Sequence, residues 1–130
     1  MNEPAIDSES LAGLYAAALD ALPRSVVVTD QETVLLVNAA AARAFGADSP
    51  TDLVGLPVDA MVHPDCHATA ALRRQLLASS REELLGLPTK LVRCDGSSVN
   101  VVADAHPVEF DGKVAFVFVS GLSVRPERQS

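Results

Sequence analysis

The chain has 130 residues, of which 48% are hydrophobic, 21% charged and 4% aromatic. This length fits one domain rather than two, and the hydrophobic content excludes an intrinsically disordered chain. The formal net charge of -7 argues against nucleic-acid binding, which requires a positive surface. The sequence has neither an apolar run of ~20 residues nor a secretory signal, and therefore predicts a cytoplasmic protein without a membrane partner.

Apolar residues near the N-terminus recur at the spacing of one helix face. They are Leu11, Leu14, Tyr15, Ala18, Leu19 and Leu22. This spacing predicts an amphipathic helix of about three to four turns, which follows a loose segment at 1–7 and which Pro23 ends. Such a helix must bury its apolar face against its own domain or against a second copy of the chain.

Between residues 25 and 62 the sequence predicts a hairpin followed by three short helices. β-Branched runs on both sides of a polar turn indicate the strands, and Asn38 and Ser49 suit helix N-caps. The expected segments are strands at 25–30 and 34–37 and short helices at 39–45, 49–55 and 57–62. Helices this short predict a segment that wraps a sheet.

A second long helix is expected over residues 65–79, with Asp65 as its N-cap. Its buried face is expected to consist of Ala68, Ala71, Leu72 and Leu76. On the same helical spacing, Arg73 and Arg74 are expected to face solvent.

The last third of the sequence predicts three strands. Asp95-Gly96 and Asp111-Gly112 are signals for two-residue hairpin turns. Pro88 places the strand at 84–94 at a sheet edge, and the run at 114–119, apolar on both faces, indicates a central strand. The predicted fold class is α+β: a five-stranded antiparallel sheet of order 2-1-5-4-3, with the short helices and the longer helix on one face. The opposite face requires the N-terminal helix or another subunit.

Several short motifs, taken in order, resemble the PAS domain, a sensory module of bacterial signalling proteins. They are Leu22-Pro23, Val28-Thr29-Asp30, Val37-Asn38-Ala39-Ala40-Ala41, Phe45-Gly46, Leu53-Val54-Gly55, His63-Pro64-Asp65 and Asp95-Gly96-Ser97. The resemblance implies a cap helix within 1–22, a PAS domain at 23–121 and a tail or linker at 122–130. Where many PAS domains continue with an Asp-Ile-Thr-like exit, this chain has Gly121-Leu122, and Pro126 would interrupt a helix that began there. We expect the sequence to be the N-terminal part of a longer regulator.

The resemblance also implies a ligand cavity between the sheet and the helices. The candidate lining residues are Val28, Leu36, Asn38, Phe45, Met61, Leu72, Leu76, Val101, Ala103, Phe116 and Phe118. The polar groups that could orient a ligand are Thr29, Asn38, His106 and Ser120. Walls with few charges suit a small apolar or weakly polar molecule, although the same residues could fill one another as a dry core.

The N-terminal helix is similar to the cap helix on which many PAS domains dimerise. The candidate interface residues are Leu11, Leu14, Tyr15, Ala18 and Leu19. The resemblance implies a homodimer that signals to a downstream kinase, cyclase or transcription regulator, as in two-component systems. The alternative is a ligand-free module that only mediates protein–protein contact.

His63, Cys66 and His67 are the candidates for a metal or haem site, because imidazole and thiolate are common ligands. No further ligand follows at a definite spacing, so we favour a loop-and-cap role, with a haem-based gas or redox sensor as a third alternative. Blue-light relatives carry an Asn-Cys-Arg motif where this chain has Ala60-Met61-Val62-His63. This difference argues against FMN chemistry, and no other cofactor is indicated.

The sequence predicts no catalytic residues and therefore no enzyme. It contains no nucleophile-elbow motif, no phosphate-binding glycine loop and no zinc-protease motif. Asp30, Asp104 and Asp111 lie at expected strand ends or turns, where carboxylates commonly cap the backbone. Cys66 and Cys94 lack a CxxC spacing and are interpreted as reduced thiols.

Overall fold

The computed structural model describes residues 8–122. Its elements are α1 (Ser8–Asp20), β1 (Ser25–Thr29), β2 (Val34–Val37), α2 (Ala39–Phe45), η1 (Pro50–Asp52), η2 (Val58–Met61), η3 (Pro64–Cys66), α3 (His67–Ser80), β3 (Leu84–Val92), β4 (Ser98–Phe110) and β5 (Lys113–Leu122), where η denotes a 3-10 helix. The strands form one antiparallel sheet in the order β2-β1-β5-β4-β3, which confirms the predicted topology. The predicted segment at 1–7 and Pro126 lie outside the described residues. No helix within residues 8–122 is long and apolar enough to cross a membrane.

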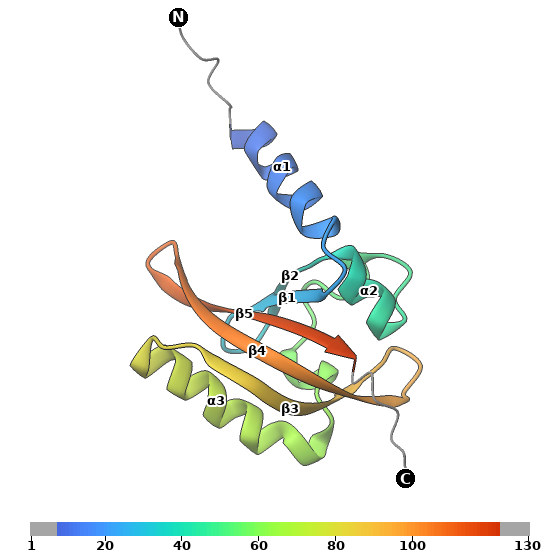
Figure 1. Ribbon diagram of the computed structural model, residues 1–130, viewed down its shortest axis with the longest axis vertical. Helices are drawn as coiled ribbons and strands as arrows, with labels where there is room; N and C mark the ends of the chain where they lie inside the picture. Colours follow the sequence, from blue (N-terminus) through green and yellow to red (C-terminus); the bar gives the residue numbers. More distant parts are fainter. Residues whose placement is uncertain (1–7, 123–130) are drawn as a thin grey trace, which may run out of the picture.

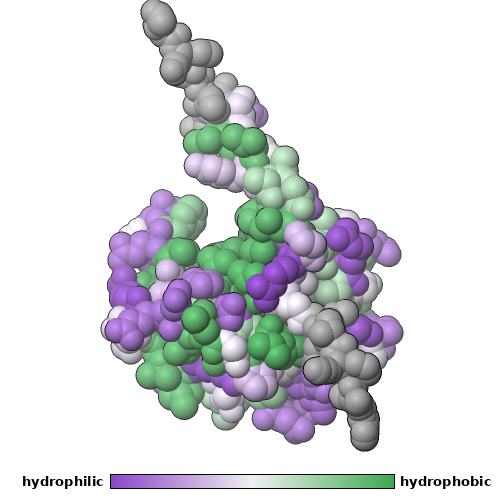
Figure 2. All heavy atoms as spheres, viewed as in Figure 1, coloured by the Kyte–Doolittle hydropathy of each residue, from purple (hydrophilic) through white to green (hydrophobic). Residues whose placement is uncertain are grey.

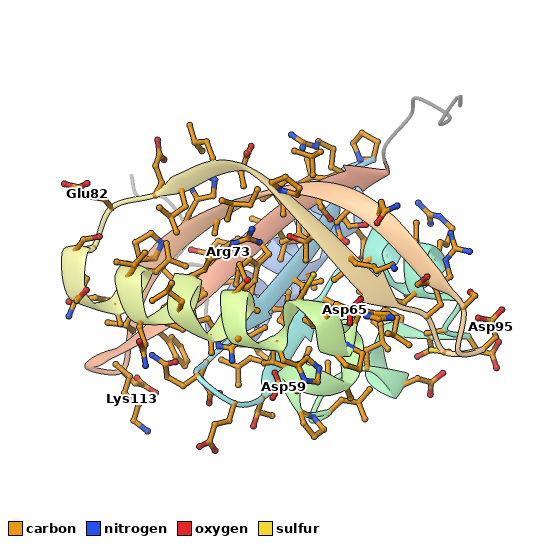
Figure 3. All side chains as sticks on the ribbon, turned by 90° about the horizontal axis from the view of Figure 1, so that it is seen from below. Asp59, Asp65, Arg73, Glu82, Asp95 and Lys113 are labelled. Atoms are coloured by element: carbon orange, nitrogen blue, oxygen red, sulfur yellow. The ribbon has the colours of Figure 1, made fainter. Side chains whose placement is uncertain are left out.

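Helices cover one face of this sheet (Figures 1 and 3). Alternation along β4 explains which side chains they cover, because successive residues of a strand point to opposite faces. Val101 and Ala103 are buried beneath the helices, whereas Val102 between them is 46% exposed on the other face. β5 lies at the centre of the sheet, as predicted, and its Phe116 packs in a buried cluster with Ala105 and Leu77 of α3.

The turns between the last strands follow their glycine signals, with one difference in length. Asp111 and Gly112 have φ values of 52° and 72°, which confirms a two-residue turn between β4 and β5. The Asp95-Gly96 turn is longer than predicted, because the Arg93 amide donates to the Ser97 carbonyl across a three-residue loop. For the same reason β3 ends at Val92 rather than at residue 94. Pro88 lies on the edge strand, as expected.

The structure corrects the predicted start and the predicted buried face of α3. The helix begins at His67 after the 3-10 turn η3, and Asp65 lies in that turn instead of acting as the N-cap. Its buried residues are Arg74 and Leu77, whereas Leu72 and Leu76 are 55% and 46% exposed. The helix is therefore rotated relative to the face that apolar spacing selected. An arginine can occupy the inner face because its long aliphatic stem packs as an apolar side chain does.

Helix α1 projects away from the sheet (Figure 1). Apolar side chains on this helix are therefore exposed to solvent. Leu14 and Tyr15 are 54% and 59% exposed. Apolar atoms gather on α1 and on the strands below it, beside a hollow in the surface (Figure 2). Within the described chain, the N-terminal helix thus does not cover the opposite face of the sheet.

The Asn38 side chain joins α1, β1 and α2 through four hydrogen bonds. Its Oδ1 accepts from the amides of Val26 and Ala41, at 3.0 and 2.9 Å, and the second of these bonds caps α2. Its Nδ2 donates to the carbonyls of Leu19 and Arg24, at 2.8 and 3.0 Å. Asn38 is fully buried, so water cannot replace these partners if the amide group is lost.

Asn38→Ala is expected to lower the free energy of unfolding by about 2–4 kcal/mol, because it removes a helix cap and leaves buried backbone groups unpaired. Urea denaturation measures this change. The control Asn100→Ala removes an exposed amide group from β4 and should change stability by less than about 0.5 kcal/mol. Equal effects of the two substitutions would contradict the role given to Asn38.

Candidate functional site

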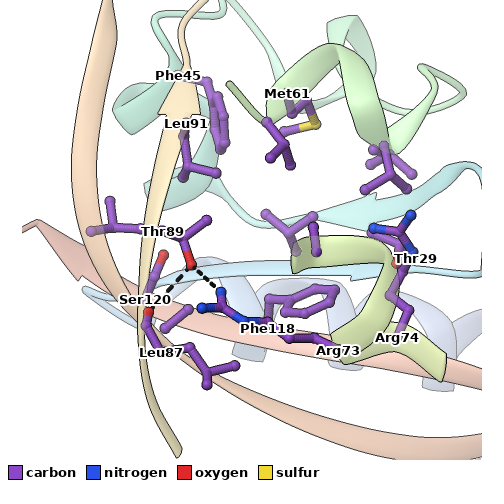
Figure 4. A pocket seen from close by; sticks show the side chains of 17 residues that line it. Thr29, Phe45, Met61, Arg73, Arg74, Leu87, Thr89, Leu91, Phe118 and Ser120 are labelled. Atoms are coloured by element: carbon purple, nitrogen blue, oxygen red, sulfur yellow. Dashed lines mark hydrogen bonds between the residues drawn. The ribbon is translucent and has the colours of Figure 1, made fainter. Parts of the chain in front are cut away.

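A cavity of about 90 Å³ lies between the sheet and the helices, principally η2 and α3 (Figure 4). Its walls are mostly apolar and come from every strand of the sheet and from α2, η2 and α3. The lining residues are Val27, Thr29, Val34, Phe45, Val58, Met61, Val62, Ala70, Arg73, Arg74, Leu87, Thr89, Leu91, Val101, Ala103, Phe118 and Ser120.

Strand pairing explains how the sheet contributes to this cavity. Val27 of β1 pairs with Phe118 of β5, and Ala103 of β4 pairs with Ser120 of β5. Residues that pair directly across antiparallel strands share one face, so these side chains form a continuous inner wall. Because Ala103 has a short side chain, it leaves space that a larger residue would fill.

The cavity brings together part of the predicted set. Phe45, Met61, Val101, Ala103 and Phe118 line it, as do the polar candidates Thr29 and Ser120. Val28, Leu36, Asn38, Leu72, Leu76 and Phe116 lie elsewhere.

Each displaced candidate has a physical reason. Val28 pairs with Leu36 and alternates with the lining residues Val27 and Thr29, so this pair belongs to the opposite face of the sheet. Leu72 and Leu76 lie on the exposed side of α3, and Phe116 is fully buried in the cluster around Leu77.

The remaining two candidates are polar and make other contacts. The Asn38 amide group is occupied by backbone partners. His106 Nδ1 lies 3.1 Å from Glu83 Oε1, away from the cavity.

Sequence reasoning missed the two arginines of the cavity wall, Arg73 and Arg74, because charged residues were expected to face solvent. Arg73 donates from Nη1 to Thr89 Oγ1 at 3.0 Å (Figure 4). Its Nη2 donates to the Pro88 carbonyl at 3.1 Å. Arg74 is only 7% exposed. Its Nη2 lies 3.9 Å from Asp59 Oδ1, and that carboxylate is itself 56% exposed. No apolar or charge pattern in the sequence distinguishes these arginines from solvent-exposed ones.

Neither haem nor a flavin fits this cavity. A cavity of ~150 Å³ holds benzene, and both cofactors are several times larger than benzene, whereas this cavity measures about 90 Å³. His67 Nε2 lies 2.9 and 2.8 Å from the carbonyl oxygens of Asp59 and Val62, to which it must donate. His63 Nδ1 accepts from the Asp65 amide. Among the described residues, no group of three or more His, Cys, Asp or Glu side chains is placed to hold a metal ion.

The carboxylates with shifted pKa values lie in turns. The amides of Glu32 and Thr33 donate to Asp30 Oδ1 at 2.8 and 2.7 Å, and these bonds lower the pKa of Asp30. The side chain and amide of Ser97 do the same for Asp95. Hydrogen bonds to the ionised form account for both shifts, and they fit a turn-capping role.

Comparison with known proteins identifies the fold. The model of the PAS fold family matches residues 13–121. A comparison with curated protein sequences found no significant match.

Solved PAS and LOV structures superpose on most of the chain. The PAS domain of an HTR-like protein from Haloarcula marismortui has a TM-score of 0.70 and 17% identity, over 88% of this chain and 93% of that one. The Rhodobacter sphaeroides LOV protein has a TM-score of 0.72 and 16% identity, over 92% of this chain and 70% of that one. The PAS domain of the nitrogen regulation protein NR(II) from Vibrio parahaemolyticus has a TM-score of 0.65 and 16% identity, over 84% and 97%. With the family match covering most of its length, the chain belongs to the PAS family of sensory domains.

Proposed function

We propose that this chain is the non-catalytic sensory and dimerisation domain of a cytoplasmic bacterial signalling regulator. The observation that carries the proposal is the cavity inside a PAS fold, because its walls are largely apolar and its volume suits a small molecule. Binding there would change the arrangement of α1 and, through it, of a partner subunit or a downstream kinase, cyclase or transcription regulator.

A continuous set of contacts supports coupling between the cavity and α1. Phe45 of α2 and Val27 of β1 line the cavity, and Asn38 binds the backbone of both elements. The same side chain binds the Leu19 carbonyl in the last turns of α1, and Asp20 Oδ1 accepts from the Ala39 amide. A ligand that favours one arrangement of α2 and β1 would therefore favour one orientation of α1.

The exposed apolar residues of α1 support dimerisation. Leu11 and Leu19 are half-buried, and Leu14, Tyr15 and Ala18 are exposed. The uncovered face of the sheet carries further apolar side chains, with Leu36 37% and Val102 46% exposed. A second copy packed on α1 and on this face would remove both surfaces from water.

Filling the cavity is expected to abolish ligand binding. Nuclear magnetic resonance of the labelled chain would be recorded with a panel of charged and neutral molecules of up to about four heavy atoms. At least one compound should shift the amide signals of Val27, Ala103 and Phe118, and Ala103→Leu should remove that response. Val102→Leu places the same side chain at the neighbouring position on the opposite face and should preserve it. If no compound perturbs these amides, the chain is a dimerisation module without a ligand.

Leu14→Glu is expected to convert a dimer into monomers and to raise the dissociation constant of the dimer at least about a hundredfold. The reason is that Leu14 of both copies would be buried in the dimer interface, where the substitution introduces two charges. Sedimentation equilibrium measures the change. Leu72→Glu is the matched control, because Leu14 and Leu72 are 54% and 55% exposed and Leu72 lies on α3. A monomeric wild-type chain, or equal effects of the two variants, would contradict dimerisation through α1.

A further inference from the structure

The cavity contains a buried positive charge whose donors are not fully used. Arg74 enters from α3, and its side chain is 8% exposed. Its Nε is buried and has no hydrogen-bond partner among the described residues. An arginine presents five N–H donors in a planar fork, so this position supplies unused hydrogen-bonding capacity inside an apolar chamber.

Asp59 compensates this charge only weakly. The separation of 3.9 Å between Arg74 Nη2 and Asp59 Oδ1 is too long for a hydrogen bond. More than half of the Asp59 side chain is exposed to water, which screens the attraction between the two groups. The guanidinium group therefore keeps its capacity to bind a second anion.

A second unused polar group lies in the same cavity. The Thr29 hydroxyl is buried and also lacks a hydrogen-bond partner among the described residues. Figure 4 draws Thr29 and Arg74 toward one end of the cavity. A hydroxyl can donate to an anion while the guanidinium group donates from a different direction.

Arg73 provides an internal comparison. It comes from the same helix and lines the same cavity, but its guanidinium group donates to Thr89 and to the Pro88 carbonyl. Arg73 thus has a structural role in attaching α3 to the edge strand, whereas the Arg74 guanidinium group has N–H donors that are free to bind a ligand.

The chemistry of the cavity restricts the anion. A carboxylate accepts two parallel hydrogen bonds from the arginine fork, and it needs fewer donors than a phosphate. The rest of the wall includes Val34, Met61 and Phe118, which contact an alkyl group favourably and a fully charged ion poorly. A volume of about 90 Å³ limits the ligand to roughly four heavy atoms, since benzene, which has six, occupies a cavity of ~150 Å³.

We propose that the ligand is a short-chain aliphatic monocarboxylate. Its carboxylate binds the Arg74 guanidinium and the Thr29 hydroxyl, and its alkyl group fills the apolar part of the cavity. This inference rests on the proposed ligand-sensing function, which it makes specific in charge and size.

Calorimetric titration of the unaltered chain tests the charge requirement directly. Acetate is the probe, and acetamide is its neutral counterpart of nearly equal shape. Acetate is expected to bind about ten- to a hundredfold more tightly than acetamide, the difference expected of charge-assisted hydrogen bonds. Inorganic phosphate tests for an unspecific anion site and is expected not to bind.

Two variants assign the contacts. Arg74→Gln should weaken acetate binding at least about tenfold and leave acetamide binding almost unchanged. Thr29→Val keeps the shape of the side chain and should weaken acetate binding severalfold. Arg43→Gln removes an equal charge from an exposed position at the end of α2 and should have no effect. Circular dichroism verifies the fold of each variant, and the comparison of acid with amide requires no variant.

The outcomes separate this inference from the proposed function. Equal binding of acetate and acetamide, with neither affected by Arg74→Gln, would overturn the carboxylate assignment and retain a ligand cavity. Phosphate binding as tight as acetate binding would also overturn it. Failure of every probe to bind would overturn the carboxylate assignment. The ligand-sensing function would then be tested separately by the wider panel of small molecules used in the nuclear magnetic resonance experiment above.

Discussion

The side chain of Asn38 determines how the parts of this domain are arranged. Its four hydrogen bonds fix the start of α2, the first strand and the last turns of α1 at one point. These elements meet where the chain leaves β2, so a single amide group satisfies buried backbone atoms that would otherwise lack partners. The position of α2, which supplies Phe45 to the cavity, and the direction in which α1 leaves the domain both depend on this group.

The cavity reflects a balance between packing and function. Phe116 and Leu77 fill the core on one side of it completely, while Ala70 and Ala103 leave space between α3 and the sheet. An unfilled volume of about 90 Å³ costs about 2 kcal/mol of stability, from ~24 cal/mol per Å³. Arg74 adds a desolvated charge to this cost. A ligand that fills the space and binds the guanidinium group would offset both costs.

Local signals in the sequence were sufficient for most of the fold but only for part of the site. The Asn38 cap, the Asp111-Gly112 turn and the edge position of Pro88 follow from backbone chemistry that acts over a few residues. Tertiary packing decides to which face of the sheet the Val28 side chain points and which side of α3 is buried. For a strand, a shift of one residue in register moves every side chain to the other face. Arg74 could not be located in this way, because its burial depends on which side of α3 packs toward the sheet.

The most direct test of the account is whether occupation of the cavity moves α1. A nitroxide label at Ala16→Cys, in a chain that also carries Cys66→Ser and Cys94→Ser, allows pulsed electron paramagnetic resonance to measure the distance between the α1 helices of a dimer. Saturating acetate is predicted to change the distance distribution, and Arg74→Gln is predicted to prevent that change. An identical distribution with and without acetate, at a concentration that calorimetry shows to be saturating, would contradict the coupling of the cavity to α1.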